Sequence, residues 1–204
     1  TSTFQQVDPV EDTVTVLIGL GGTGIDCLTE IKKMVKEHLR PDNPDDEEHP
    51  YQHIKFLAVD ADSLETASKI LNSDECFELS FFDVQATLMQ EHINKFDFEY
   101  RYWKRCAEYG LRHRTNDFLE KMKELITQAR KNLAVSATRI NVHVFSGVGG
   151  MAGGGMFLDV CYLIRRALRE VTGGDGMISG YFFLPEVNLA KIPSQVTLVR
   201  KMVV

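Results

Sequence analysis

The sequence predicts an α/β fold with a doubly wound, mostly parallel sheet and helices on both faces. Short apolar segments alternate with longer segments whose apolar residues recur at helical spacing, which is typical of such sheets. Two glycine-rich stretches each lie between a strand-like and a helix-like segment. The 204 residues are 44% hydrophobic and 25% charged, as in an ordinary globular protein.

The expected strands are short, largely apolar segments. They cover residues 14–18, 54–59, 77–81, 140–145 and 177–184. The first is apolar throughout apart from Thr15, as expected for a central parallel strand.

The expected helices follow these strands. One carries Ile25, Leu28, Ile31 and Val35 on a single stripe and is stopped by Pro41. A short helix is expected to run from an N-cap at Ser63 through Leu71, and an irregular helical region covers 84–109. After a turn at 110–114, Thr115 or Asn116 should cap a long helix, and 156–168 should form another.

Composition excludes several classes of function. A net charge of −6 argues against a dedicated nucleic-acid binder, although residues 100–105 mix basic and aromatic side chains. We favour a helix with one aromatic core face there. Four cysteines without a C-x-x-C pair argue against a zinc site or a disulfide framework. No apolar run is long enough to span a membrane and no signal peptide opens the chain, so we expect a cytoplasmic protein. The acidic segment 42–49 reads as solvated surface.

The stretch from Ser146 to Gly155 contains six glycines in ten residues, between an apolar strand and an amphipathic helix. Bare backbone at the positive end of a helix dipole is suited to binding phosphate. A flexible linker is the alternative interpretation. A linker rarely separates a strand from a strongly periodic helix, so we favour phosphate binding.

A second glycine motif, Gly19-Leu-Gly-Gly-Thr-Gly24, follows the first strand and opens a helix. This G-x-G-x-x-G pattern marks Rossmann-like dinucleotide sites but also serves other nucleotide enzymes. Asp60 and Asp62 end the second strand. A carboxylate there could accept a hydrogen bond from a ribose hydroxyl, or it could simply cap the next helix. Two glycine loops facing one ligand would suit a triphosphate gripped from both sides.

Together these residues resemble a known family. Leu17 to Gly24, Phe56 to Asp62 and Phe145 to Gly155 are similar, in order and placement, to three nucleotide loops of the tubulin/FtsZ superfamily. The resemblance looks closest to prokaryotic tubulin-like proteins. It implies a nucleotide-binding domain over 13–190, preceded by an irregular arm at 1–12.

The resemblance also shows departures from the family pattern. Asp26 replaces a frequent Asn, and in the signature G-G-G-T-G-[ST]-G the residues Met151, Ala152 and Gly154 replace a glycine and two hydroxyl residues. Loss of those hydroxyls would change affinity, nucleotide choice or hydrolysis. The nucleotide-contacting residues that the resemblance implies are Gly21, Gly22, Thr23, Asp26, Asp60, Asp62, Gly147, Gly149, Gly150, Met151, Ala152, Gly153 and Gly154, with Arg112 and Arg114 near the γ-phosphate.

The family's activity implies binding of GTP or GDP with Mg²⁺ and slow hydrolysis coupled to head-to-tail filament assembly through the nucleotide face. Its activating acidic residues come from the second domain of the next subunit, so we assign no catalytic residue here. The chain begins at Thr1 and stops at Val204 within an apolar run, so we expect a piece of a longer protein. Residues 191–204 would then start a connecting helix, and residues 1–204 would bind nucleotide but hydrolyse it poorly.

Three other functions remain open. An adenylating enzyme of the ubiquitin-activating type uses G-x-G-G-x-G but would not need the 147–155 loop. An NAD-dependent oxidoreductase would need a hydride-transfer site that does not stand out here. A degenerate tubulin-like scaffold would assemble or recruit partners without nucleotide turnover.

Overall fold

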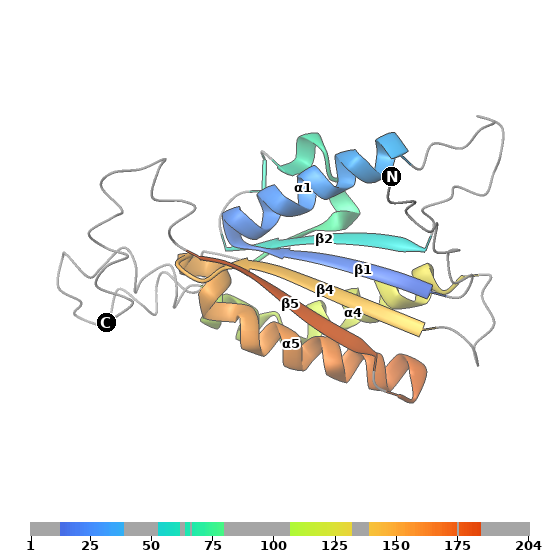
Figure 1. The fold of residues 1–204 in the computed structure, drawn as a ribbon. Coiled ribbons are helices and arrows are strands. Elements are labelled where there is room, and N and C mark those ends of the chain that lie inside the picture. The colour runs from blue at the N-terminus through green and yellow to red at the C-terminus, as the bar shows by residue number, and fades with distance from the viewer. Residues whose placement is uncertain are drawn as a thin grey trace, which may run out of the picture.

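The computed structural model describes residues 13–38, 53–61, 64–65, 67–79, 107–131, 139–174 and 176–184, without the side chain of Met151. Five parallel strands form one sheet in the order β3-β2-β1-β4-β5 (Figure 1). Their bounds are β1 Thr13–Leu20, β2 Ile54–Asp60, β3 Cys76–Glu78, β4 Arg139–Gly147 and β5 Met177–Phe183. All five expected strands are therefore present, two of them longer at both ends than predicted.

Helices cover both faces of this sheet. Helix α1 (Gly21–His38) lies on one face, while α4 (Thr115–Ala129) and α5 (Met151–Thr172) pack side by side on the other (Figure 1). The two short 3-10 helices are Ala67–Lys69 and Ser73–Glu75. The prediction of a doubly wound α/β sheet is confirmed.

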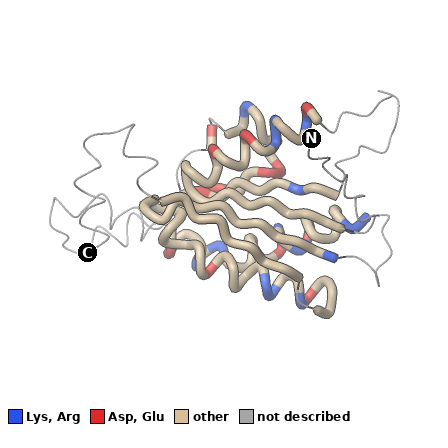
Figure 2. The backbone as a smooth tube through the Cα atoms, viewed as in Figure 1, with Lys and Arg blue, Asp and Glu red and all other residues tan. Residues whose placement is uncertain are grey.

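Both faces of β1 are buried, which explains why this strand lies at the centre of the sheet. Val14, Val16 and Ile18 point into the larger core, which α4 and α5 close, whereas Leu17 points into the smaller core beneath α1. Side chains alternate between faces along a strand, so a strand apolar at nearly every position must be covered twice. Charged residues accordingly lie mainly on the helices and at strand ends, and few lie within the sheet (Figure 2). None of the described helices has the length and apolar character needed to cross a bilayer.

A buried ion pair fastens α1 to the segment that precedes β3. Lys32 donates from its ammonium to the Glu75 carboxylate, and the two side chains are only 5% and 14% exposed. The Lys32 ammonium also lies 5.5 Å from the centre of the Phe56 ring on β2. The Glu75 carboxylate additionally accepts from the backbone N–H of Asn72 at 2.7 Å. These contacts fix the connection from β2 to β3 against the helix.

The short helix expected through Leu71 is present as the 3-10 helix Ala67–Lys69, and Ser63, its expected N-cap, lies outside the described residues. Two other local predictions were wrong. Residues 107–113 are helical where the sequence predicts a turn at 110–114, and the chain turns only at Arg114. Arg114, and not Thr115 or Asn116, is the N-cap of α4. The Thr115 hydroxyl instead donates back to the Leu111 and Arg112 carbonyls at 3.0 and 2.9 Å.

The strand order reverses direction between β1 and β4. From β1 the chain proceeds outward to β2 and β3, then returns to place β4 on the other side of β1. The register pairs Leu20 with Val59 on one side and with Ser146 on the other. The carboxyl ends of three strands therefore meet at one edge, at the switch point where such sheets bind ligands.

Candidate functional site

The N-termini of α1 and α5 lie against each other at the switch point. Gly21, the first residue of α1, has a φ of 65°, and an added Cβ there would lie 2.8 Å from the backbone nitrogen of Gly153. A Cβ on Gly153 would lie 2.6 Å from both the Leu20 carbonyl oxygen and the Ser146 Oγ. Only glycine permits this conformation and this approach of one helix to the other.

A second pair of contacts joins α1 to β4. A Cβ on Gly24 would fall 2.2 Å from the carbonyl oxygen of Phe145, and one on Gly147 would fall 3.1 Å from the Thr23 Oγ1. The two glycine-rich turns are thus packed into a single unit, and the sequence prediction that they meet at one sheet edge holds for their described residues.

This unit presents helix N-termini without carboxylates. Neither α1 nor α5 has an acidic residue in its first turn. The N-cap of α5 is Gly150, which has no side chain to cap the helix, and the first intrahelical bond runs from the Gly154 N–H to the Gly150 carbonyl at 3.2 Å. The earlier N–H groups of each helix have no partner within the helix, and the positive dipole ends favour an anion. Space for one exists beside Gly22, where an added Cβ would meet nothing within 4 Å.

Ser146 is a residue that the sequence reasoning did not assign to the site. Its side chain is fully buried at the end of β4, and its hydroxyl has no hydrogen-bond partner in the structure. A buried hydroxyl without a hydrogen-bond partner lowers the stability of the fold, so its presence indicates a role other than packing. It lies beneath the turn that joins β4 to α5, close to Gly153. In the sequence it reads only as the first residue of a glycine run.

The tip of β2 contributes Asp60, which is 9% exposed. Its carboxylate accepts from the backbone N–H of Ala61 at 2.7 Å, and its backbone carbonyl accepts from the Leu79 N–H at 2.8 Å. The carboxylate therefore helps to shape the turn after β2, next to the end of β1. Asp62 lies outside the described residues.

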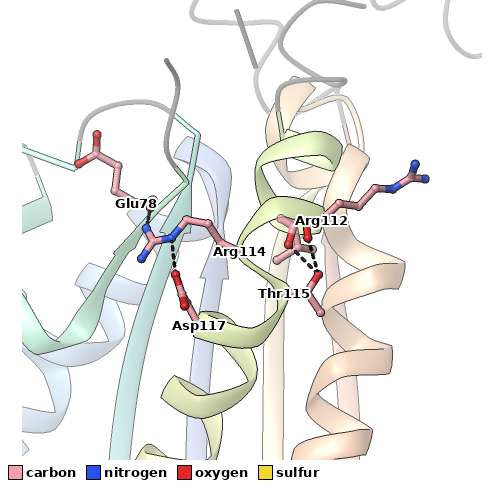
Figure 3. Close-up of polar contacts among 6 residues, drawn as sticks. Glu78, Arg112, Arg114, Thr115 and Asp117 are labelled. Atoms are coloured by element: carbon pink, nitrogen blue, oxygen red, sulfur yellow. Dashed lines mark hydrogen bonds and ion pairs between the residues drawn. The ribbon is translucent and has the colours of Figure 1, made fainter. Parts of the chain in front are cut away.

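The two candidate arginines occupy different surroundings (Figure 3). Arg114 donates to the Glu78 carbonyl, pairs with Asp117 at 3.2 Å and lies 4.4 Å from the Phe77 ring centre. Arg112 is exposed and points away from this group, with its guanidinium 5.9 Å from the Tyr109 ring centre. Arg114 thus joins β3 to α4, and Arg112 extends into solvent.

The other expected contact residues are distributed along the same two helices and their turns. Asp26 is exposed on α1, beyond the first turn, and its carbonyl accepts from the Thr29 hydroxyl at 2.9 Å. Gly149 and Ala152 are half-buried, and the backbone of Met151 begins α5. Val148 is 47% exposed, and its N–H donates to the Phe183 carbonyl at 3.0 Å, which joins this turn to the end of β5.

The three described cysteines are poor nucleophiles, and the described residues form no metal-binding cluster. Burial raises the pKa of the Cys27, Cys76 and Cys161 thiols, with added repulsion from Glu75 at Cys76. A raised pKa keeps the thiol protonated and unreactive. No group of three or more His, Cys, Asp or Glu side chains in the described part of the chain could hold a metal ion. Among these residues the switch point can bind an anion through main-chain N–H groups and hydroxyls.

Comparison with known proteins agrees with this arrangement. A family model described as tubulin-like matches residues 16–98 and 100–200. No curated protein and no solved structure matches the chain. The family match covers both glycine-rich turns, the tip of β2 and all five strands, nearly from end to end. The chain therefore belongs to the tubulin-like family.

Proposed function

We propose that the switch point binds GTP or GDP, with the phosphates seated between the N-termini of α1 and α5. The observation that carries the proposal is the buried Ser146 hydroxyl, which lacks a partner and lies beside Gly153, where the glycine-lined starts of α1 and α5 meet. A phosphate oxygen would give such a hydroxyl an acceptor and would also accept from N–H groups of the first helical turns, which have no partner within their own helix. Membership of the tubulin-like family favours a guanine nucleotide over other phosphate ligands.

In this proposal the residues that the structure describes supply no metal ligand. Mg²⁺ would arrive bound to the phosphates and keep several of its waters, as it commonly does in nucleotide sites. Thr23, half-buried on the first turn of α1 and next to Gly147, is the second hydroxyl proposed to contact the phosphates. Asp60, at the end of the neighbouring strand, is the proposed contact to the ribose.

We propose head-to-tail self-association through this same edge, with slow GTP hydrolysis in the assembled protein in the cytoplasm. Val148 and Leu184 are 47% and 58% exposed beside the glycine turn, and exposed apolar residues around a ligand favour a covering partner. The bond from the Val148 N–H to the Phe183 carbonyl would let the ligand stabilise that rim.

A scaffold without turnover is the second candidate function. Its support is the loop sequence, in which Met151 and Ala152 stand where the family pattern has a glycine and a hydroxyl residue. Fewer side-chain donors to the phosphates would weaken stabilisation of the charge that develops during hydrolysis. This candidate shares the binding site and differs only in the chemistry after binding.

The test is to denature the purified protein, identify any released nucleotide by chromatography, and titrate GTP, ATP and NAD into the emptied protein. We expect GDP or GTP to be released and GTP to bind most tightly. Release of NAD or an adenylate, or the absence of any binding, would contradict the proposal. GTP binding without hydrolysis, even at high protein concentration, would favour the scaffold function over the GTPase function.

Matched glycine variants should distinguish a loss of nucleotide binding from a loss of folding. Gly22→Val places a side chain in the open space at the helix end and should abolish binding without unfolding the protein. Gly174→Val, an exposed position beyond the opposite end of α5, is the control and should bind normally. Gly153→Val is unsuitable, because its side chain would strike the Leu20 carbonyl and Ser146 even without a ligand.

A further inference from the structure

The end of β5 carries two exposed aromatic side chains that the core does not account for. Tyr181 and Phe182 are 44% and 52% exposed, and β5 pairs with β4 alone among the described strands. In this register Tyr181 and Phe182 lie opposite Phe145 and Ser146, which lead toward residues 148–150, the β4–α5 turn. Both rings therefore lie next to the turn that contributes to the proposed nucleotide site.

Tyr181 packs on the face of the sheet that α1 covers. Its ring stacks on Phe145 with 4.9 Å between the ring centres, and its hydroxyl lies at a hydrogen-bond distance of 3.0 Å from Nδ1 of His143. The carbonyl oxygen of Phe145 is the atom that lies 2.2 Å from an added Cβ on Gly24, at the start of α1. Tyr181 thus holds the residue of β4 against which α1 begins.

Phe182 packs on the opposite face of the sheet. Its ring centre lies 4.4 Å from that of Phe157, in the second turn of α5. An added Cβ on Gly180 would lie 2.8 Å from Cζ of Phe157, so glycine in the strand permits this close approach. The next residue, Phe183, accepts the hydrogen bond from the Val148 N–H at 3.0 Å, so β5 also contacts the turn directly.

The two aromatic pairs join β5 to the elements on both sides of the turn. We call Phe145, Phe157, Tyr181 and Phe182 the aromatic clamp, because one pair fastens β5 to β4 and the other fastens it to α5. The β4–α5 turn itself contains two glycines, which have the greatest backbone freedom. We propose that the aromatic clamp sets the position of this turn, which makes Tyr181 and Phe182 positioning residues for the proposed nucleotide site. The consequence for nucleotide binding rests on that proposed function, whereas the consequence for the turn does not.

The first test is hydrogen exchange of the Val148 amide, measured by NMR on the full chain without nucleotide. Tyr181→Leu and Phe182→Leu should each raise its exchange rate by up to about tenfold, because an aromatic pair contributes up to roughly that factor. Tyr181→Phe keeps the stacking and should exchange like the wild type. Met177→Ser is the matched control, because it removes another exposed apolar side chain at the opposite end of the same strand and should leave the Val148 rate unchanged.

The second test is the dissociation constant for GTP on the same variants. Both leucine variants should raise it by about five- to tenfold, and Tyr181→Phe and Met177→Ser should bind like the wild type. The inference is overturned if neither leucine variant changes the Val148 exchange rate, if Met177→Ser changes it as much, or if exchange becomes faster while GTP affinity stays the same. A wild-type chain that binds no GTP contradicts the proposed function, and the exchange rates alone then decide whether the clamp positions the turn.

Discussion

The close approach of α1 to β4 predicts that two glycines in one helix respond to alanine in opposite directions. At Gly24 the new Cβ would lie 2.2 Å from the Phe145 carbonyl oxygen and 3.0 Å from its carbonyl carbon. Ordinary contact begins at 3.4 Å, and Phe145 lies in β4 between β1 and β5, so its backbone cannot move without disturbing the sheet. Helix α1 must shift instead and lose contact with the smaller core.

The expected cost of Gly24→Ala follows from that overlap. Overpacking a tight interior costs about 1–3 kcal/mol, and a clash of backbone with backbone belongs at the upper end. We therefore expect the free energy of unfolding to fall by about 3 kcal/mol, which for a domain of this size lowers Tm by roughly 6–12 °C. Urea denaturation followed by circular dichroism measures the change.

Gly22→Ala is the matched control, two residues away in the same helix. Its Cβ would meet nothing within 4 Å, and alanine loses less backbone entropy than glycine in a helix. The free energy of unfolding should rise by about 0.5 kcal/mol. Equal effects of the two substitutions, or a stable Gly24→Ala protein, would refute the close packing of α1 against β4.

Three further substitutions test the core, the buried ion pair and the effect of pH. Phe118→Ala should lower the free energy of unfolding by about 3–5 kcal/mol in urea denaturation, because the ring is fully buried and packs edge-to-face with Phe77 at 5.4 Å. Lys32→Met should destabilise strongly by leaving the Glu75 carboxylate unpaired, and adding Glu75→Gln should recover most of the loss in the same assay. Burial lowers the pKa of His143, so its contribution is complete above the unfolded pKa of about 6.5 and is lost as the pH falls through the folded value. His143→Gln should therefore show a smaller loss of stability between neutral and mildly acidic pH; an unchanged pH profile would show that this histidine does not contribute.

The strand pattern and the glycine turns could be predicted because both are local. A short β-branched segment such as residues 14–18 favours a buried strand. A glycine-rich turn after a strand favours a helix as the next element. Alternation of strands and helices then implies a parallel sheet, and a parallel sheet brings the carboxyl ends of neighbouring strands to one edge. These steps need no knowledge of contacts between distant residues.

The features that the sequence did not reveal depend on such distant contacts. The site role of Ser146 becomes visible only when its hydroxyl is seen to be buried without a partner. The family resemblance implies that Arg114 lies near the γ-phosphate, and only the structure reveals its contact with the Glu78 carbonyl, which is far away in sequence. The helix that replaces the expected turn at 110–114 passes Leu79, which lies within 3.1 Å of an added Cβ on Gly110. Packing against Leu79, the residue that follows β3, explains why glycine at that position does not break the helix.

The pairing of β1 with β4 also has a consequence for how the protein matures. Gly19 and Phe145 are register partners although the whole β2–α4 region separates them in the chain. Contacts between residues so far apart form slowly, because the entropy cost of closing a long loop must be met before the contacts can stabilise the fold. During synthesis the first glycine turn leaves the ribosome well before the second, so the proposed site between α1 and α5 cannot form until β4 has inserted beside β1. If the proposed nucleotide binds only the finished site, it would stabilise the last-formed arrangement, and nucleotide supply would then set how much newly made protein completes folding.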